Sequence, residues 1–147
     1  MAKIESYFNS EDEATIVEAI RKAEKQTSGE IKVHVEEHCF IDLLDRSAEV
    51  FGKLKMHETK LRNGTLIYIA MEDHLFSIIG DIGINNVIPK DFWDEAKDIM
   101  EENFKAGNIA KGLELGIEKV GDKLKEFFPY QDDDENELSD DISFGKI

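Results

Sequence analysis

Apolar residues recur along the chain with two different spacings, and the wider spacing predicts helices. In residues 11–25 they return every three or four positions, as on the buried face of a helix. Ser10 precedes this stretch as a candidate N-cap, and Glu13 completes a capping box. Helical spacing is also found in three later stretches, residues 45–56, 89–105 and 108–127. The pattern therefore predicts four helices.

Three shorter stretches have the pattern of β-strands. Ile31, Val33 and Val35 alternate with polar residues, which predicts a strand with one buried face. Residues 66–70 are apolar throughout and predict a fully buried strand after an Asn-Gly turn. Residues 75–79 form another apolar run. Since only a few residues separate these two runs, they are expected to form an antiparallel hairpin.

The order of these elements predicts the fold class. The first strand, a helix and the second strand form a unit that normally crosses over with a right hand, so these two strands should be parallel. The hairpin then adds a third strand in the opposite direction. Helices on both faces complete an α/β/α three-layer sandwich, a modified Rossmann-like fold with a mixed sheet. We expect one domain over residues 1–130, followed by an acidic tail over residues 131–147.

Composition narrows the classes of partner. The 147 residues include 33 acidic and 18 basic side chains, for a formal net charge of −15. Such a chain should avoid nucleic acid and anionic membrane surfaces, whereas divalent cations are compatible with it. The alternative is that the net negative charge serves only to keep the protein soluble. No apolar stretch approaches the roughly 20 residues that span a bilayer, and no leader is visible, so a cytoplasmic location is predicted.

The predicted tail differs from the body in composition. Residues 131–147 hold seven acidic side chains and one lysine. Leu138, Ile142 and Phe144 interrupt this charge, and a purely disordered tail would rarely need them. We expect the tail to dock on the body. The alternative is a short acidic motif that recognises a partner protein.

Candidate metal ligands come from an acidic break between the two hairpin strands. Glu72-Asp73-His74 should lie at the carboxyl ends of the first two strands, together with the loop after the first strand. Ligands of open α/β sheets usually bind at such ends, and clustered carboxylates suit calcium or magnesium. The predicted metal ligands are Asp42, Asp45 and Asp73, with Glu11, Asp12 and Glu72 nearby. The alternative is a polar turn beside two helix caps.

Four short motifs together resemble one known family. They are Thr-Ser-Gly-Glu-Ile-Lys-Val at 27–33, Asn-Gly-Thr-Leu-Ile-Tyr-Ile-Ala at 63–70, Glu-Asp-His at 72–74 and Gly-Asp-Ile-Gly-Ile at 80–84. In order and spacing these resemble the TPM domain over roughly residues 8–128. The resemblance implies a Rossmann-like α/β/α fold, calcium or another divalent ion in some members, and acid phosphatase activity in a thylakoid lumen member.

Three functions remain open on the sequence. The first is a divalent-metal-binding domain, with calcium as the favoured ion and magnesium as the alternative, that acts as an interaction or maintenance module. The second is a metal-assisted phosphatase, for which the pattern supplies no activated nucleophile. Arg46 and Arg62, the basic candidates near loops, are expected at opposite ends of the sheet. The third is a protein-binding module that uses the acidic tail.

Overall fold

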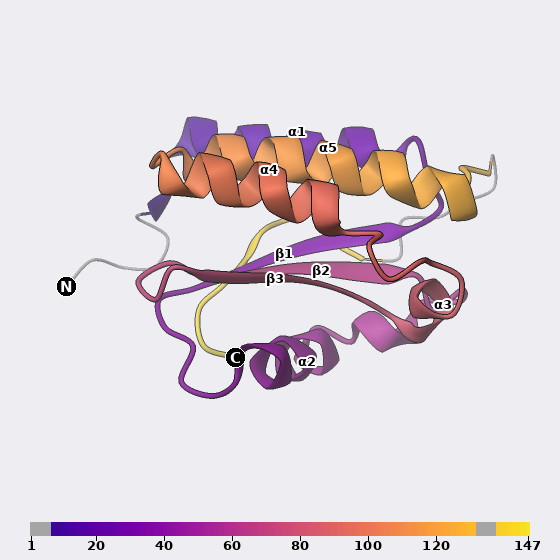
Figure 1. The fold of residues 1–147 in the computed structure, drawn as a ribbon, viewed down its shortest axis with the longest axis horizontal. Coiled ribbons are helices and arrows are strands. Elements are labelled where there is room, and N and C mark those ends of the chain that lie inside the picture. The colour runs from indigo at the N-terminus through magenta and orange to yellow at the C-terminus, as the bar shows by residue number, and fades with distance from the viewer. Residues whose placement is uncertain (1–6, 132–137) are drawn as a thin grey trace.

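The computed structural model describes residues 7–131 and 138–147, which form a four-stranded sheet between two layers of helices (Figure 1). The strands lie in the order β3-β2-β1-β4. In chain order the elements are α1 (Ser10–Glu24), β1 (Glu30–Glu36), α2 (Leu43–Lys53), the 3₁₀ turn η2 (Met56–Glu58), β2 (Gly64–Ala70), β3 (Leu75–Gly80), α3 (Ile82–Asn85), α4 (Asp94–Lys105), α5 (Ile109–Phe127) and β4 (Ser143–Phe144).

The sheet pairing confirms the predicted topology. β1 and β2 are parallel, with Glu30 beside Gly64 and Glu36 beside Ala70. β2 and β3 form the antiparallel hairpin. β4 was not predicted as a strand. It pairs in parallel with the other edge of β1, where Val35 lies beside Phe144.

Helices cover both faces of the sheet, which confirms the α/β/α architecture. α1, α4 and α5 lie on one face, and α2 lies on the other (Figure 1). The larger core joins β1 and β2 to the three helices through residues such as Ile20, Val33 and Ile117. A smaller core of Val50, Met56, Leu66, Tyr68 and Ala70 lies on the α2 side. Each sheet face thus buries apolar side chains, as a three-layer fold requires.

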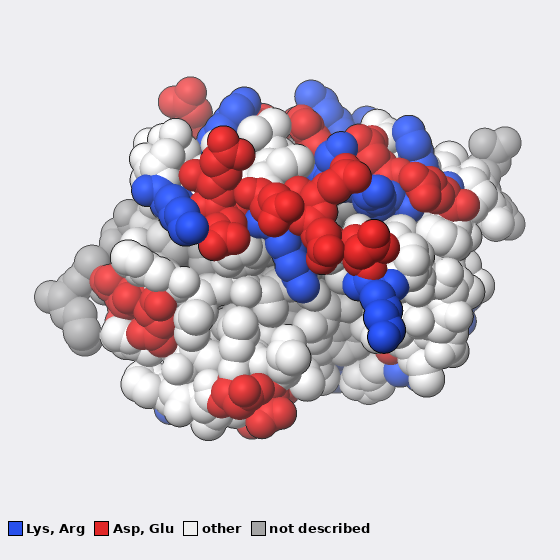
Figure 2. All heavy atoms as spheres, in the orientation of Figure 1, with Lys and Arg blue, Asp and Glu red and all other residues white. Residues whose placement is uncertain are grey.

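Charged side chains are unevenly distributed over the molecule. On the face shown in Figure 2, acidic and basic side chains alternate over the upper helical layer, while the lower part carries far fewer charges. Lys119 and Lys123 on α5 pair with Glu95 on α4, for example. Exposed ion pairs of this kind contribute little to stability. The charges of the helical layer are those of an ordinary solvated surface.

Several predicted boundaries were wrong, and each has a local cause. The N-cap of α1 is Asn9 and not Ser10, because the Asn9 side chain accepts a hydrogen bond from the amide of Asp12. The predicted helix 89–105 begins only at Asp94, after a turn in which Phe92 N donates to Pro89 O. A short helix, α3, follows Asp81 where the sequence predicted only a loop.

The polar side of β1 is a larger departure. Lys32, His34 and Glu36 alternate with apolar residues and were expected to face solvent, yet all three are buried. The helix α2 and residues 138–147 cover this side of the strand. The alternating pattern therefore predicted the strand correctly but not the burial of its polar face.

None of the helices within residues 7–131 and 138–147 is long and apolar enough to cross a membrane. The acidic stretch 132–137, which forms much of the predicted tail, lies outside the described residues, and so do residues 1–6.

Candidate functional site

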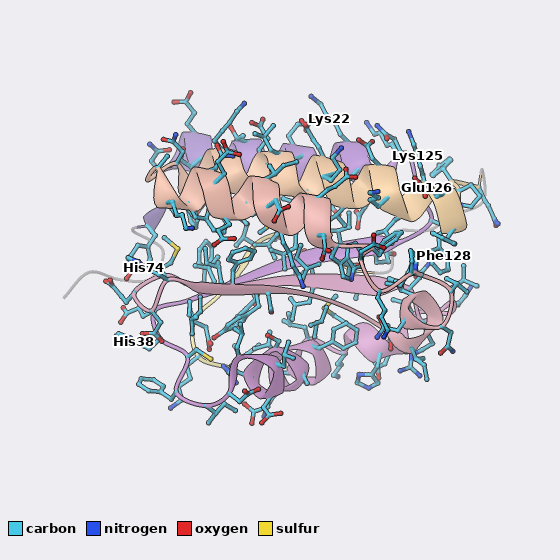
Figure 3. All side chains as sticks on the ribbon, in the orientation of Figure 1. Lys22, His38, His74, Lys125, Glu126 and Phe128 are labelled. Carbon is cyan, nitrogen blue, oxygen red and sulfur yellow. The ribbon has the colours of Figure 1, made fainter. Side chains whose placement is uncertain are left out.

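Two connections cross at the carboxyl ends of β1 and β2. One is the β1–α2 loop, residues 37–42, and the other is the β2–β3 turn, residues 71–74. The parallel register of the strands continues into them, since Met71 N donates to Glu36 O and Glu72 N donates to Glu37 O, each at 2.8 Å. We call residues 37–42 and 71–74 the loop crossing. Figure 3 shows His38 and His74 at this same end of the sheet.

Asp73 joins the two segments of the loop crossing with its side chain. Its carboxylate accepts from His38 Nδ1 at 2.8 Å and from the amide of Cys39 at 2.6 Å. These hydrogen bonds lower the pKa of Asp73, and the one to Asp73 raises the pKa of His38. The turn itself is tight, because His74 adopts a left-handed φ of 54° that few non-glycine residues use.

Further carboxylates stand beside Asp73. Glu72 accepts a hydrogen bond of 2.7 Å from the hydroxyl of Tyr7, which links the segment before α1 to the hairpin turn. This bond, with the charge of nearby Glu37, helps raise the pKa of Tyr7 to about 12. Glu37 and Glu72 also act on the charge of His38. Three acidic side chains, Glu37, Glu72 and Asp73, therefore act on the charge of one histidine.

The predicted metal ligands fall in two places. Asp42 caps α2, because its side chain accepts from the amides of Leu44 and Asp45. Asp45 is exposed in the first turn of that helix, and Asp73 lies at the loop crossing. Within the described ranges, no three His, Cys, Asp or Glu side chains are gathered closely enough to hold an ion. The carboxylates have the chemistry that calcium prefers, but the three are not assembled into a site.

Glu11 and Asp12, the other acidic residues expected nearby, lie in the first turn of α1. The helix begins at the end of the sheet that carries the loop crossing (Figure 1). Their placement there suits the positive end of the helix dipole, so capping accounts for them without a ligand.

A pocket of about 490 Å³ opens beside the β1–α2 loop. Its base is a buried ion pair in which the guanidinium of Arg46 donates to both carboxylate oxygens of Glu36. Tyr68 also donates its hydroxyl to Glu36. Burial alone would raise the pKa of Glu36, but the contacts with Arg46 and Tyr68 outweigh it and lower that pKa. The remaining lining residues are Glu37, His38, Phe40, Ile41, Glu49, Gly145 and Lys146.

The rim of this pocket carries apolar side chains that sequence reasoning missed. Phe40 and Ile41 line the pocket and are 79% and 48% exposed, and Leu44, in the first turn of α2, is 61% exposed. We call these three residues the apolar rim. Residues 39–41 are adjacent and apolar, a pattern that favours burial. Instead the chain turns outward here, and the half-buried thiol of Cys39 donates to Ile41 O. Three exposed large apolar side chains within five residues are typical of a contact surface.

The two arginines considered for phosphate binding are both engaged elsewhere. Arg46 pairs with Glu36 inside the protein, and Arg62 pairs with Asp81 at the far end of the sheet. The loop crossing therefore presents carboxylates and an imidazole rather than a guanidinium clamp for a phosphate ester.

Comparison with known proteins agrees with this architecture. Residues 3–123 match the family model of the TPM domain. The NMR structure of BA42 protein from the psychrophilic bacterium Bizionia argentinensis is similar at a TM-score of 0.92 and 52% identity, covering 99% of this chain and 100% of that one. The N-terminal domain of cg2496 protein from Corynebacterium glutamicum shares the fold at a TM-score of 0.65 and 15% identity, covering 84% of this chain and 78% of that one.

No curated protein matches the chain. The family model nevertheless spans most of the sequence, and the resemblance carried by the four motifs is confirmed. The chain therefore belongs to the TPM domain family.

Proposed function

We propose that this TPM domain binds a divalent cation at the loop crossing, with calcium as the favoured ion and magnesium as the alternative. In this proposal the cation positions an interaction surface that the same loops carry. The observation behind it is Asp73, whose carboxylate ties the two loops together while Glu37 and Glu72 stand close by. A cation that binds Asp73 would act on both loops at once.

The chemistry of the loop crossing favours a hard cation. Calcium binds roughly six to eight oxygen atoms in irregular arrangements, drawn from carboxylates, main-chain carbonyls and water. The side chains of Glu72 and His38 are exposed, so they can turn at low cost. Binding requires such a rearrangement, because the carboxylates are not gathered beforehand. We therefore expect an affinity that depends on loop order as well as on charge.

The proposed consequence of binding is control of the apolar rim. Phe40 and Ile41 belong to the loop that Asp73 holds through the amide of Cys39. A tighter loop presents its exposed apolar side chains in one arrangement, and this lowers the entropic cost of docking a partner. The domain would then serve as a cation-dependent interaction module.

The direct test is a calcium titration followed by amide NMR shifts. We expect the amides of residues 37–42 and 71–74 to move at millimolar calcium or below, while the amides of α4 and α5 stay in place. A parallel titration with magnesium ranks the two ions. If the amides of the loop crossing do not move at millimolar concentrations of either ion, the proposal is wrong.

Matched variants locate the ligands. Asp73→Asn keeps the size of the side chain and removes its charge, so the shifts should disappear or need much more calcium. Asp98→Asn makes the same change at an exposed position of α4 and should behave like the natural chain. Asp42→Asn and Asp45→Asn then decide whether the start of α2 contributes ligands, as the sequence predicted.

A further inference from the structure

The buried polar face of β1 receives another segment of the same chain. Lys32 and His34 lie inside the protein, and a buried charged or polar group is costly unless it has partners. Both side chains form hydrogen bonds with residues 139–143, more than 100 positions later in the sequence. The polar side chains of β1 therefore form one wall of a groove that binds an extended segment.

The contacts recognise an extended backbone. Lys32 Nζ donates to Ser139 O at 3.1 Å and to Asp141 O at 2.8 Å. Further along, His34 Nδ1 lies 2.8 Å from Ser143 Oγ. Gly145 N then donates to Val35 O at 2.8 Å. This is the arrangement by which proteins add a peptide to the edge of a sheet, where main-chain contacts bind and side pockets select.

Two side chains anchor the end of the segment. Phe144 is half-buried, and its ring centroid lies 6.4 Å from that of Phe8. Lys146 Nζ lies 6.0 Å from the centroid of the Phe40 ring, within the range of a cation–π contact. Glu37 and Glu49 line the same pocket, so its rim suits a positive charge. The anchors thus select an aromatic side chain followed by a basic one.

The groove has space beyond what its own segment fills. A pocket of about 490 Å³ lies beside Lys146 at one end, and a second of about 490 Å³ lies beside Leu138 and Ser139 at the other. The paired part, β4, is only two residues long. A short edge strand with half-buried side chains opens more easily than the core of a sheet.

We propose that the edge of β1 is a peptide-binding groove that residues 138–147 occupy within the same chain. From a partner protein it accepts an extended segment of matching chemistry, in the order aliphatic, serine, aromatic, glycine and basic residue. A partner is favoured over a second copy, because two chains that each carry a charge of −15 repel each other. The basic anchor reaches the loop crossing at Phe40, whereas the hydrogen bonds along β1 do not depend on cation binding there.

The test weakens the internal segment and supplies it from outside. Gly145→Pro, made in the full chain, removes the N–H group that donates a hydrogen bond to Val35 O. Proline also cannot adopt the φ of 87° observed at this position. A fluorescent peptide of residues 138–147 should bind this variant at least about tenfold more tightly than the natural chain. The reason is that the tethered segment competes at an effective concentration on the order of millimolar. The anisotropy is measured with a chelator present, which separates the result from cation binding.

Control peptides define the required chemistry. A scrambled peptide and one with alanine in place of phenylalanine should both fail to bind Gly145→Pro. Should that variant not fold, Phe144→Ala provides a second chain with a weakened segment. Equal binding of the scrambled peptide, or no binding to either folded variant, would overturn the groove. If the natural chain forms a dimer and the peptide dissociates it, a second copy of the chain occupies the groove. That result would overturn the assignment to a partner protein.

A change in the groove itself completes the test. Lys32→Met, added to Gly145→Pro, removes the donor to two peptide carbonyls and should weaken peptide binding by about tenfold, as loss of a charged hydrogen bond does. Lys125→Met, at the end of α5, is the matched control and should leave peptide affinity unchanged (Figure 3). An equal effect of both substitutions would contradict the assigned contacts.

Discussion

The two ends of the sheet use the same residue types for opposite purposes. At the loop crossing, Asp73 is partly exposed and accepts from two groups of the β1–α2 loop, the exposed His38 and the amide of Cys39. At the other end, Asp81 is buried and accepts from Arg62 at 2.7 and 2.8 Å. Asp81 also caps α3 through the amide of Ile82. The first arrangement can exchange partners, whereas the second closes one end of the fold.

Glycine marks the closed end. Gly83 lies so near the preceding segment that a methyl group added there would stand 2.2 Å from Leu61 O. Packing and an ion pair therefore explain the Gly-Asp-Ile-Gly motif. The motif richest in glycine thus stabilises the fold, whereas the acidic turn carries the candidate functional side chains.

The largest expected effect tests the closed end. Gly83→Ala forces a side chain against the main chain of Leu61 and should lower the free energy of unfolding by about 3 kcal/mol, as severe overpacking does. Gly52→Ala is the control, because nothing lies within 4 Å of the added methyl group in α2. That change should be neutral or slightly stabilising. Urea denaturation of both variants measures the difference, and equal stabilities would contradict the proposed close approach.

A smaller loss is expected from Asp81→Ala. The substitution removes the cap of α3 and leaves Arg62 without its carboxylate. Loss of the cap alone should cost about 1 kcal/mol of unfolding free energy. Asp91→Ala, at an exposed position before α4, provides the control. If thermal denaturation shows both variants to be equally stable, Asp81 does not hold this end together.

A pH effect is expected where α1 ends, close to the start of β1. Burial and a hydrogen bond with Asp140 raise the pKa of Glu24 from 4.5 to about 10. The folded protein thus retains a proton that the unfolded chain releases, and this contribution to stability falls as the pH rises from about 4.5 towards 10. Between about pH 6 and about pH 9, the melting temperature of Glu24→Gln should fall less than that of the natural chain.

The matching control is Glu18→Gln, an exposed position on the same helix. It should follow the natural chain at every pH. Parallel melting curves for the natural chain and Glu24→Gln across this range would show that Glu24 does not carry a proton in the folded state.

The smallest effect on stability is expected at the loop crossing. Asp73→Asn keeps an acceptor for the amide of Cys39 and removes only the charge beside an exposed histidine. Its melting temperature should stay close to that of the natural chain, in contrast to Gly83→Ala. Hydrogen exchange should nevertheless speed up in residues 37–42. A large loss of stability would show that the loop crossing is structural, like the opposite end.

The regular part of the fold could be predicted from local spacing. The apolar runs at 66–70 and 75–79 predicted β2 and β3, since a short connection leaves little choice but a hairpin. β4 could not be predicted in the same way. Only two of its residues pair, and the partner that makes them a strand lies more than 100 positions earlier. The burial of Lys32 and His34 was missed for the same reason.

The meeting of the two connections at one end of the sheet was predicted, but the arrangement of their side chains was not. The topology places the β1–α2 loop and the β2–β3 turn together, as expected from parallel strands. The direction of each side chain depends on tertiary details such as the left-handed backbone of His74 and the capping role of Asp42. These details carry no signal in the spacing of acidic residues. The metal set of Asp42, Asp45 and Asp73 and the cytoplasmic location stay predictions.

Calorimetric titration with calcium tests the central claim most directly, because it measures affinity at the loop crossing without a spectroscopic assignment. The natural chain and Asp98→Asn should bind calcium with the same dissociation constant. Asp73→Asn should bind at least about tenfold more weakly, since a carboxylate ligand contributes on the order of 1.4 kcal/mol or more. Equal affinities for all three proteins, or no binding by the natural chain at millimolar calcium, would contradict the account.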